Sequence, residues 1–141
     1  MILHCTYEEL QALTAGAELV LTGGAGGRGC AVAAPSEVAM QIELLLPRLN
    51  GDLSITSLAE QRQVREVVAL ICERLRTRLE GEVVEHHPAH EEAVLLYFDY
   101  AHVLKVLDRL DRIGGEMSAL VELMTGAAPT PETAAAVSFP D

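Results

Sequence analysis

The residues best suited to chemistry lie in one short polar stretch between two long segments of apolar periodicity. Residues 82–91 contain three histidines and several carboxylates, and imidazole nitrogens and carboxylate oxygens bind zinc and other divalent transition metals. His87 and His90 are three residues apart, a spacing at which two side chains on one helical turn can share a metal. The polar residues of the stretch are Glu82, Glu85, His86, His87, His90 and Glu91. The candidate metal ligands are His86, His87, His90 and Glu91. An exposed polar turn with a helix-capping histidine accounts for the same residues without a metal.

A second polar group forms only if the two long segments fold back on each other around residue 87. Glu73 would then lie near His102, and Arg76 near Asp99, with Cys72 alongside. A buried or half-buried network of this kind could do acid–base work or bind a metal, and its catalytic candidates are Glu73, Asp99 and His102. A salt-bridge layer that holds two helices in register is the alternative, because a buried charge must be paired.

Catalytic motifs with a known mechanism are missing from the sequence. It contains neither G-x-S-x-G nor H-E-x-x-H, and it lacks the repeated Glu-x-x-His pair of di-iron helical bundles. Cys72 falls on or near an apolar stripe, which favours a small buried side chain over a nucleophile. We therefore expect a protein that is not an enzyme and has no cofactor, unless the histidines hold a divalent metal.

Both polar groups depend on two long helices that meet at the histidine-rich stretch. Ser57 and Glu60 form a capping box, from which a helix is predicted to about residue 85. A second helix is predicted over residues 87–113, because Pro88 fits the first helical position and Gly114 follows the last apolar residue. The short connection predicts an antiparallel αα-hairpin. A single kinked helix through Pro88 is the alternative.

The helix predicted over residues 87–113 is apolar around most of its circumference. Leu95, Phe98, Val106 and Ile113 fall among the charged residues opposite its main apolar face. A helix of this kind is usually buried on more than one side. We therefore predict a homo-oligomer, most simply a two-fold dimer, with these four residues at the interface.

Shorter elements surround the predicted hairpin. Thr6 and Glu9 form a capping box for a helix over residues 7–21, and a further helix begins near residue 34 and kinks or ends at Pro47. Residues 2–5 and 53–55 could pair as a minimal two-stranded ladder, and a short helix is predicted over residues 117–124. The fold class predicted is all-α, a helical bundle built on the long hairpin.

The chain length of 141 residues predicts one helical domain over residues 1–126 and a tail over residues 127–141. A glycine-rich connector over residues 22–34 lies inside the domain, and it lacks the lysine of a phosphate-binding loop. The tail contains three prolines; it is either disordered or docked through Val137 and Phe139.

Charge and cysteine content limit the kinds of partner and the cellular compartment that we expect for the protein. The net charge of −11 argues against nucleic-acid binding, since phosphate contacts need clustered lysine and arginine. Cys5, Cys30 and Cys72 are odd in number and form no C-x-x-C pair, which favours a reduced, cytoplasmic setting. No apolar run reaches the roughly 18 residues that a membrane span needs, and no signal peptide is recognisable.

These patterns predict a small cytoplasmic protein that self-associates and acts through a helical surface, as an adaptor, interaction or structural protein. Its partner is a second copy, with another protein as a further possibility. A metal-binding helical protein with a His-rich turn is the alternative function, and a sensor that binds a small molecule between helices is the third.

Overall fold

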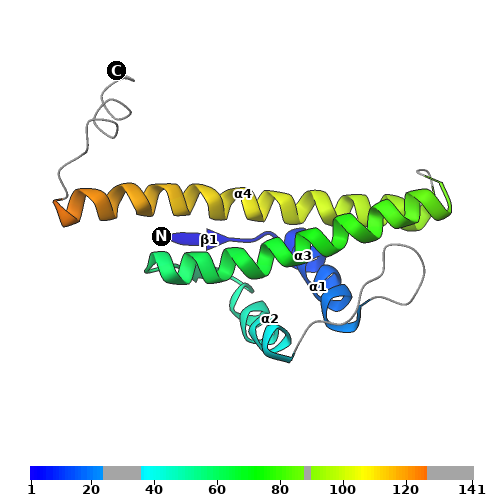
Figure 1. Ribbon diagram of the computed structural model, residues 1–141, viewed down its shortest axis with the longest axis horizontal. Coiled ribbons are helices and arrows are strands. Elements are labelled where there is room, and N and C mark those ends of the chain that lie inside the picture. The colour runs from blue at the N-terminus through cyan, green and yellow to red at the C-terminus, as the bar shows by residue number, and fades with distance from the viewer. Residues whose placement is uncertain (24–35, 88–89, 127–141) are drawn as a thin grey trace, which may run out of the picture.

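The computed structural model describes residues 1–23, 36–87 and 90–126. Within these residues four helices and two short strands follow in the order β1 (Ile2–His4), α1 (Tyr7–Thr22), α2 (Ser36–Arg48), β2 (Asp52–Ser54), α3 (Leu58–Glu85) and α4 (Glu91–Thr125). The protein is an all-α helical bundle with a minimal antiparallel sheet, as the sequence predicts (Figure 1). The predicted connector beyond residue 23, Cys30, Pro88 and the tail with Val137 and Phe139 lie outside the described residues.

The long hairpin is formed by α3 and α4, which lie side by side and antiparallel (Figure 1). Contacts between the helices set the register. Gln61 Nε2 donates to the carbonyl oxygen of Leu110 at 2.7 Å, and Arg65 Nε lies 2.6 Å from Asp111 Oδ1. Residues equally distant from the turn therefore face each other, as predicted, and the alternative of one kinked helix is wrong.

The helix α4 is longer at its C-terminal end than the sequence suggests. It continues through Gly114 and Gly115 to Thr125, so the prediction of an end at Gly114 and a separate short helix is wrong. Gly114 lies against α3, where an added Cβ would come within 2.6 Å of Gln61 Nε2. Close packing of the two helices compensates for the loss of about 1 kcal/mol in helix propensity that a glycine causes. The helix ends instead at Gly126, whose φ is 64°.

The N-terminal elements form as their sequence signals predict. Thr6 and Glu9 make both bonds of the capping box, at 2.9 and 3.2 Å. The helix α2 ends one residue after Pro47. In the sheet, Leu3 of β1 pairs with Leu53 of β2, so that both leucines point into the core.

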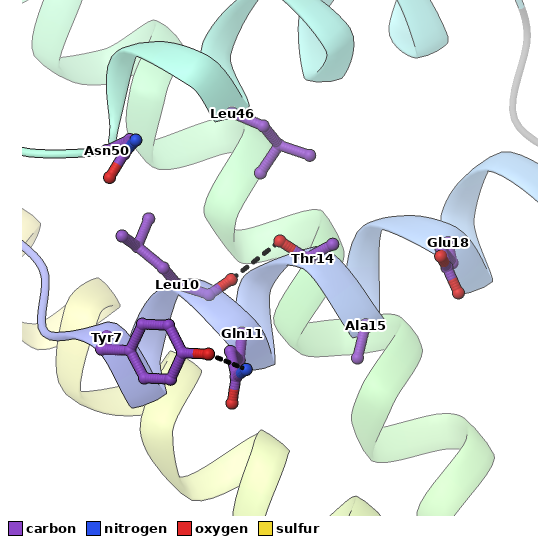
Figure 2. Close-up of a pocket in the computed structure, with 8 residues that line it drawn as sticks. All are labelled: Tyr7, Leu10, Gln11, Thr14, Ala15, Glu18, Leu46 and Asn50. Atoms are coloured by element: carbon purple, nitrogen blue, oxygen red, sulfur yellow. Dashed lines mark hydrogen bonds between the residues drawn. The ribbon is translucent and has the colours of Figure 1, made fainter.

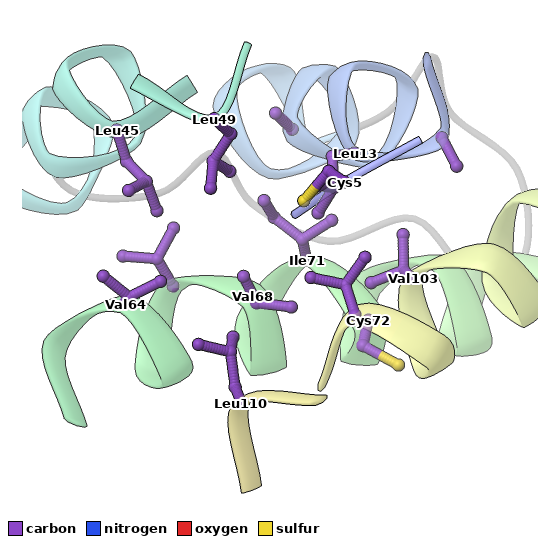
Figure 3. Close-up of a cluster of buried hydrophobic side chains, with 14 of the residues drawn as sticks. Cys5, Leu13, Leu45, Leu49, Val64, Val68, Ile71, Cys72, Val103 and Leu110 are labelled. Atoms are coloured by element: carbon purple, nitrogen blue, oxygen red, sulfur yellow. The ribbon is translucent and has the colours of Figure 1, made fainter. Parts of the chain in front are cut away.

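Every element contributes to one cluster of buried apolar side chains (Figure 3). The cluster consists mainly of leucine, isoleucine and valine, and it contains Cys5 and Cys72. Gly16 lets α1 approach α3 closely, because an added Cβ would clash with Ile71 Cγ2 and lie 2.9 Å from Leu75 Cδ1. The buried face of α4 therefore meets both α3 and α1.

Candidate functional site

The end of the hairpin holds a buried carboxylate, Glu82, near the last turn of α3. Its side chain is 3% exposed. Its Oε1 lies 3.1 Å from His86 Nε2 and 3.6 Å from His90 Nδ1, and its Oε2 lies 2.9 Å from Arg78 Nη1. A negative charge is thus enclosed between one guanidinium and two imidazole rings.

Helical spacing brings these groups together. Arg78, Glu82 and His86 follow at intervals of four residues, so each lies one turn above the previous residue on the same face of α3. His90 comes from the other side of the turn, where it caps α4 by accepting the Glu92 N–H at 3.3 Å. The rings of His86 and His90 stack with centroids 4.5 Å apart and planes 18° apart. The predicted helix-capping histidine is therefore confirmed, and it is His90.

One oxygen of Glu82 lacks a hydrogen bond. Among the described residues, Oε2 accepts none, although Arg78 Nη1 lies within 2.9 Å, because a close approach without an aligned N–H is an ion pair but no hydrogen bond. Burial of a carboxylate costs free energy unless its oxygens are satisfied. One oxygen of the Glu82 carboxylate is thus held by an ion pair alone, without a hydrogen bond.

The histidine-rich stretch yields one group of side chains that could hold a metal. Glu82, Glu85 and His86 each offer a ligand atom, and these atoms lie within 4.8 Å of one another. Of the four ligands predicted from the sequence, His86 belongs to this group and His90 stacks on it. His87 and Glu91 are not members of it.

Glu82 belongs to the predicted polar stretch, but the sequence analysis did not single it out as a ligand. The signal that identifies it is its spacing of four residues from His86 on one helix, with Glu85 between them. Its burial follows from the packing of the hairpin end and carries no local sequence signal.

The second predicted group, Glu73, Arg76, Asp99 and His102, does not form a network. Glu73 and Arg76 pair with each other on exposed α3 surface, at 2.8 and 2.9 Å. On α4, His102 Nδ1 hydrogen-bonds the Phe98 carbonyl oxygen at 2.7 Å. Among the described residues no hydrogen bond or ion pair joins the two helices at these positions. The physical reason is that an i,i+3 partner on the same helix is closer than a flanking residue of the other helix.

Asp99 of this second group is half-buried on α4. Burial raises the pKa of its carboxyl, nearby His102 lowers it, and Glu92 adds to the rise. Cys72 of the same region is buried, and burial raises the pKa of its thiol. This agrees with the expectation of a small buried side chain, because the nucleophilic thiolate is disfavoured.

The four predicted interface residues divide into two pairs. Leu95 and Phe98 are each 54% exposed. Val106 and Ile113 are buried, at 0% and 9%, in the chain's own core, so they offer no surface to a second copy. The prediction for this second pair is corrected because α4 packs against α1 as well as α3, which buries a wider arc of the helix than one neighbour would.

A buried ion pair that the sequence analysis missed ties α1 to α4. Arg109 Nη1 and Nη2 lie 2.5 and 2.7 Å from Glu9 Oε1 and Oε2, and Arg109 also donates to the His4 carbonyl oxygen at 3.2 Å. Burial by itself raises the pKa of Glu9, but the hydrogen bonds from Arg109 and Thr6 outweigh it and the pKa is lowered. The capping box marks Glu9 in the sequence, whereas no local signal marks Arg109 as its partner.

A shallow depression of about 520 Å³ lies between α1 and α2 (Figure 2). Its polar side chains include Tyr7, Gln11 and Thr14. Gln11 donates to the Tyr7 hydroxyl at 2.7 Å, and the Thr14 hydroxyl donates to the Leu10 carbonyl oxygen. These three side chains are thus hydrogen-bonded within α1, and Glu18 and Asn50 are the other polar residues that line the depression.

Comparison with protein-family models, curated protein sequences and solved structures finds no match for this chain. Among the described helices, none is long and apolar enough to cross a membrane.

Proposed function

We propose that this protein is a self-associating helical interaction protein and that its binding surface is the outer face of α4. The observation that carries the proposal is an exposed apolar stripe on that face, here named the outer stripe. Its members are Val94, Leu95, Tyr97, Phe98 and Leu104. Each of them is at least 39% exposed. A contiguous apolar surface of this kind is typical of a protein–protein contact.

The exposed end of α4 carries a second apolar region. The helix continues past the beginning of α3 (Figure 1), so its last turns have no hairpin partner on that side. The large apolar side chains exposed there are Leu120, Val121, Leu123 and Met124. This second region is separate from the outer stripe, and the proposed contact uses the outer stripe alone.

A second copy of the chain is the partner that the outer stripe fits best. If two α4 helices pack antiparallel about a two-fold axis near residue 99, Val94 faces Leu104 of the partner subunit. In the same register the ring of Tyr97 faces the small Ala101 of the partner subunit. One pair then joins two apolar side chains and the other sets a large ring against a small side chain, so the two faces can pack closely.

Sedimentation equilibrium on the wild-type protein and on Phe98→Asp tests this proposal. The wild type is expected to be a dimer at micromolar concentration. The variant is expected to raise the dissociation constant by about a hundredfold or more, because the two-fold axis buries an unpaired carboxylate in each copy. Leu44→Asp, at a similarly exposed leucine of α2, is the control and should leave the dimer unchanged.

Two results would contradict the proposal. One is a monomeric wild type at concentrations well above the micromolar range. The other is a Phe98→Asp protein that stays folded by circular dichroism and dimerises as tightly as the wild type, which would place the contact on another face of the molecule.

A further inference from the structure

We propose that the turn end of the α3–α4 hairpin is a binding site for a divalent transition-metal ion of the zinc class. The ligands are Glu82, Glu85 and His86, whose ligand atoms lie within 4.8 Å of one another. His90 stacks on His86 and holds its ring in place. The site is separate from the outer stripe and does not depend on self-association.

The two innermost ligand atoms are separated by a distance that suits zinc. Zinc binds nitrogen and oxygen ligands at about 2.0–2.1 Å in a tetrahedron, so neighbouring ligand atoms lie about 3.3 Å apart. Glu82 Oε1 and His86 Nε2 are 3.1 Å apart, close to that separation. Glu85 and His86 are exposed, so an ion can reach both ligands from solvent.

The proposed ligand Glu82 is a buried carboxylate. Its side chain is 3% exposed, and its Oε2 accepts no hydrogen bond among the described residues. Arg78 stands 2.9 Å from that Oε2 and leaves Oε1 facing the histidines. Oε1 is thus the oxygen that would bind the ion, while Arg78 orients the carboxylate from behind as an outer partner of the ligand.

The ligand chemistry selects the class of metal. One imidazole and two carboxylates suit zinc, iron(II), cobalt(II) and manganese(II) better than calcium or magnesium, which prefer oxygen ligands alone. Three protein ligands leave a fourth position for water or another small ligand. Glu82 and Glu85 lie in the last turn of α3 and His86 is its C-cap, so metal binding is expected to stabilise the end of that helix.

The test is titration of chelator-treated, full-length protein with zinc chloride by isothermal calorimetry, followed by cobalt(II) absorption in the visible range. We expect one ion per chain, a tetrahedral cobalt spectrum and a rise in the thermal unfolding midpoint with added zinc. Glu82→Gln keeps the size of the side chain and removes its charge. It should lower zinc affinity at least about tenfold, as loss of one ligand does.

His86→Ala is a second variant. It changes an exposed residue and keeps the buried carboxylate of Glu82, so we expect it to fold like the wild type. It should lower the affinity to a similar degree. His87→Ala is the matched control, since it removes the neighbouring histidine that lies outside the proposed ligand group. Each zinc affinity is compared with that of the wild type in the same buffer.

Three outcomes overturn the proposal. The first is no heat, no cobalt spectrum and no change in the unfolding midpoint with about a hundredfold excess of zinc. The second is binding that Glu82→Gln and His86→Ala leave unchanged. The third is loss of affinity in His87→Ala alone, which would move the site to the other histidines of the turn. In the first case the buried carboxylate is an ion-pair partner of Arg78 only.

Discussion

Glu9 and Glu82, the buried glutamates among the described residues, are stabilised to different degrees. Glu9 receives a bidentate pair from Arg109 and a backbone bond from Thr6, so both oxygens have donors. Glu82 has one oxygen that accepts no hydrogen bond among the described residues. At the scale of single residues, Glu9 is therefore a structural group, and Glu82 is the buried glutamate at which we propose that an ion binds.

Glu9→Gln is expected to destabilise the protein by about 2 kcal/mol at pH 7. Removing one partner of a buried ion pair costs roughly 3–5 kcal/mol, and the 35% exposure of the Arg109 side chain lowers that figure through solvent screening. The capping box survives, because glutamine serves at that position. Urea unfolding at pH 7 measures the difference.

The pKa of Glu9 is lowered below its ordinary value of 4.5, so its contribution to stability is present above about pH 4.5. It is lost as the pH falls through the lower pKa of the folded state. The destabilisation by Glu9→Gln should therefore shrink below pH 4.5, whereas Glu8→Gln, an exposed neighbour in the same helical turn, should stay close to the wild type throughout. A cost that is independent of pH would show that packing, not charge, is responsible.

Sequence signals predict the local contacts of such residues but not their tertiary contacts. The spacing of Thr6 and Glu9 predicts a cap, and the cap forms. The partner across the helices, Arg109, is 100 residues away, and only the tertiary packing selects it. The same holds for Glu82, whose burial depends on the way the hairpin end closes.

Glycines inside the helices show how an element responds to its neighbours. Gly16 lies where α1 crosses α3, and an added Cβ would clash with Ile71. Gly115 of α4 has nothing within 4 Å of its added Cβ. Helix propensity assigns the same free-energy cost to both glycines, whereas the packing around the two positions differs.

Gly16→Ala should therefore destabilise the protein by about 1–2 kcal/mol. Overpacking costs roughly 1–3 kcal/mol, and it exceeds the gain of about 1 kcal/mol in helix propensity. Gly115→Ala is the matched change in open space and should stabilise by about 0.5–1 kcal/mol. The thermal midpoints and urea unfolding curves of the two variants measure the contrast. Stabilisation by both substitutions would mean that α1 and α3 lie farther apart than the structure shows.

Helix bounds follow from sequence where a cap marks them. The capping box at Thr6 and the N-cap at Ser57 start α1 and α3 at the predicted places. The predicted box at Ser57 forms only in part, because Glu60 accepts the Thr56 N–H and not that of Ser57. The end of α4 was predicted wrongly because Gly114 looks like a helix terminator, whereas its lack of a side chain serves the contact with Gln61. A single sequence does not distinguish a terminating glycine from a packing glycine.

For the whole molecule, the sequence predicts the helical bundle but not the number of neighbours of each helix face. Leu95 and Phe98 are exposed, as a binding surface requires. Val106 and Ile113 were assigned to a surface because the apolar pattern was compared with a single neighbour, α3. The position of α1 against α4 is a tertiary fact, and it explains the extra apolar width of that part of the helix without a second copy.

The net charge of −11 sets the salt dependence of the proposed self-association. Two copies with the same charge repel each other, and salt screens that repulsion over a distance of about 10 Å at 0.1 M. The dimer held by the outer stripe should therefore bind more tightly as sodium chloride rises, with a several-fold lower dissociation constant by sedimentation equilibrium between low and moderate salt. Phe98→Asp should remain monomeric at every concentration of salt. Weaker association at higher salt would instead identify ion pairs as the force that joins the copies, and the apolar outer stripe would no longer explain the dimer.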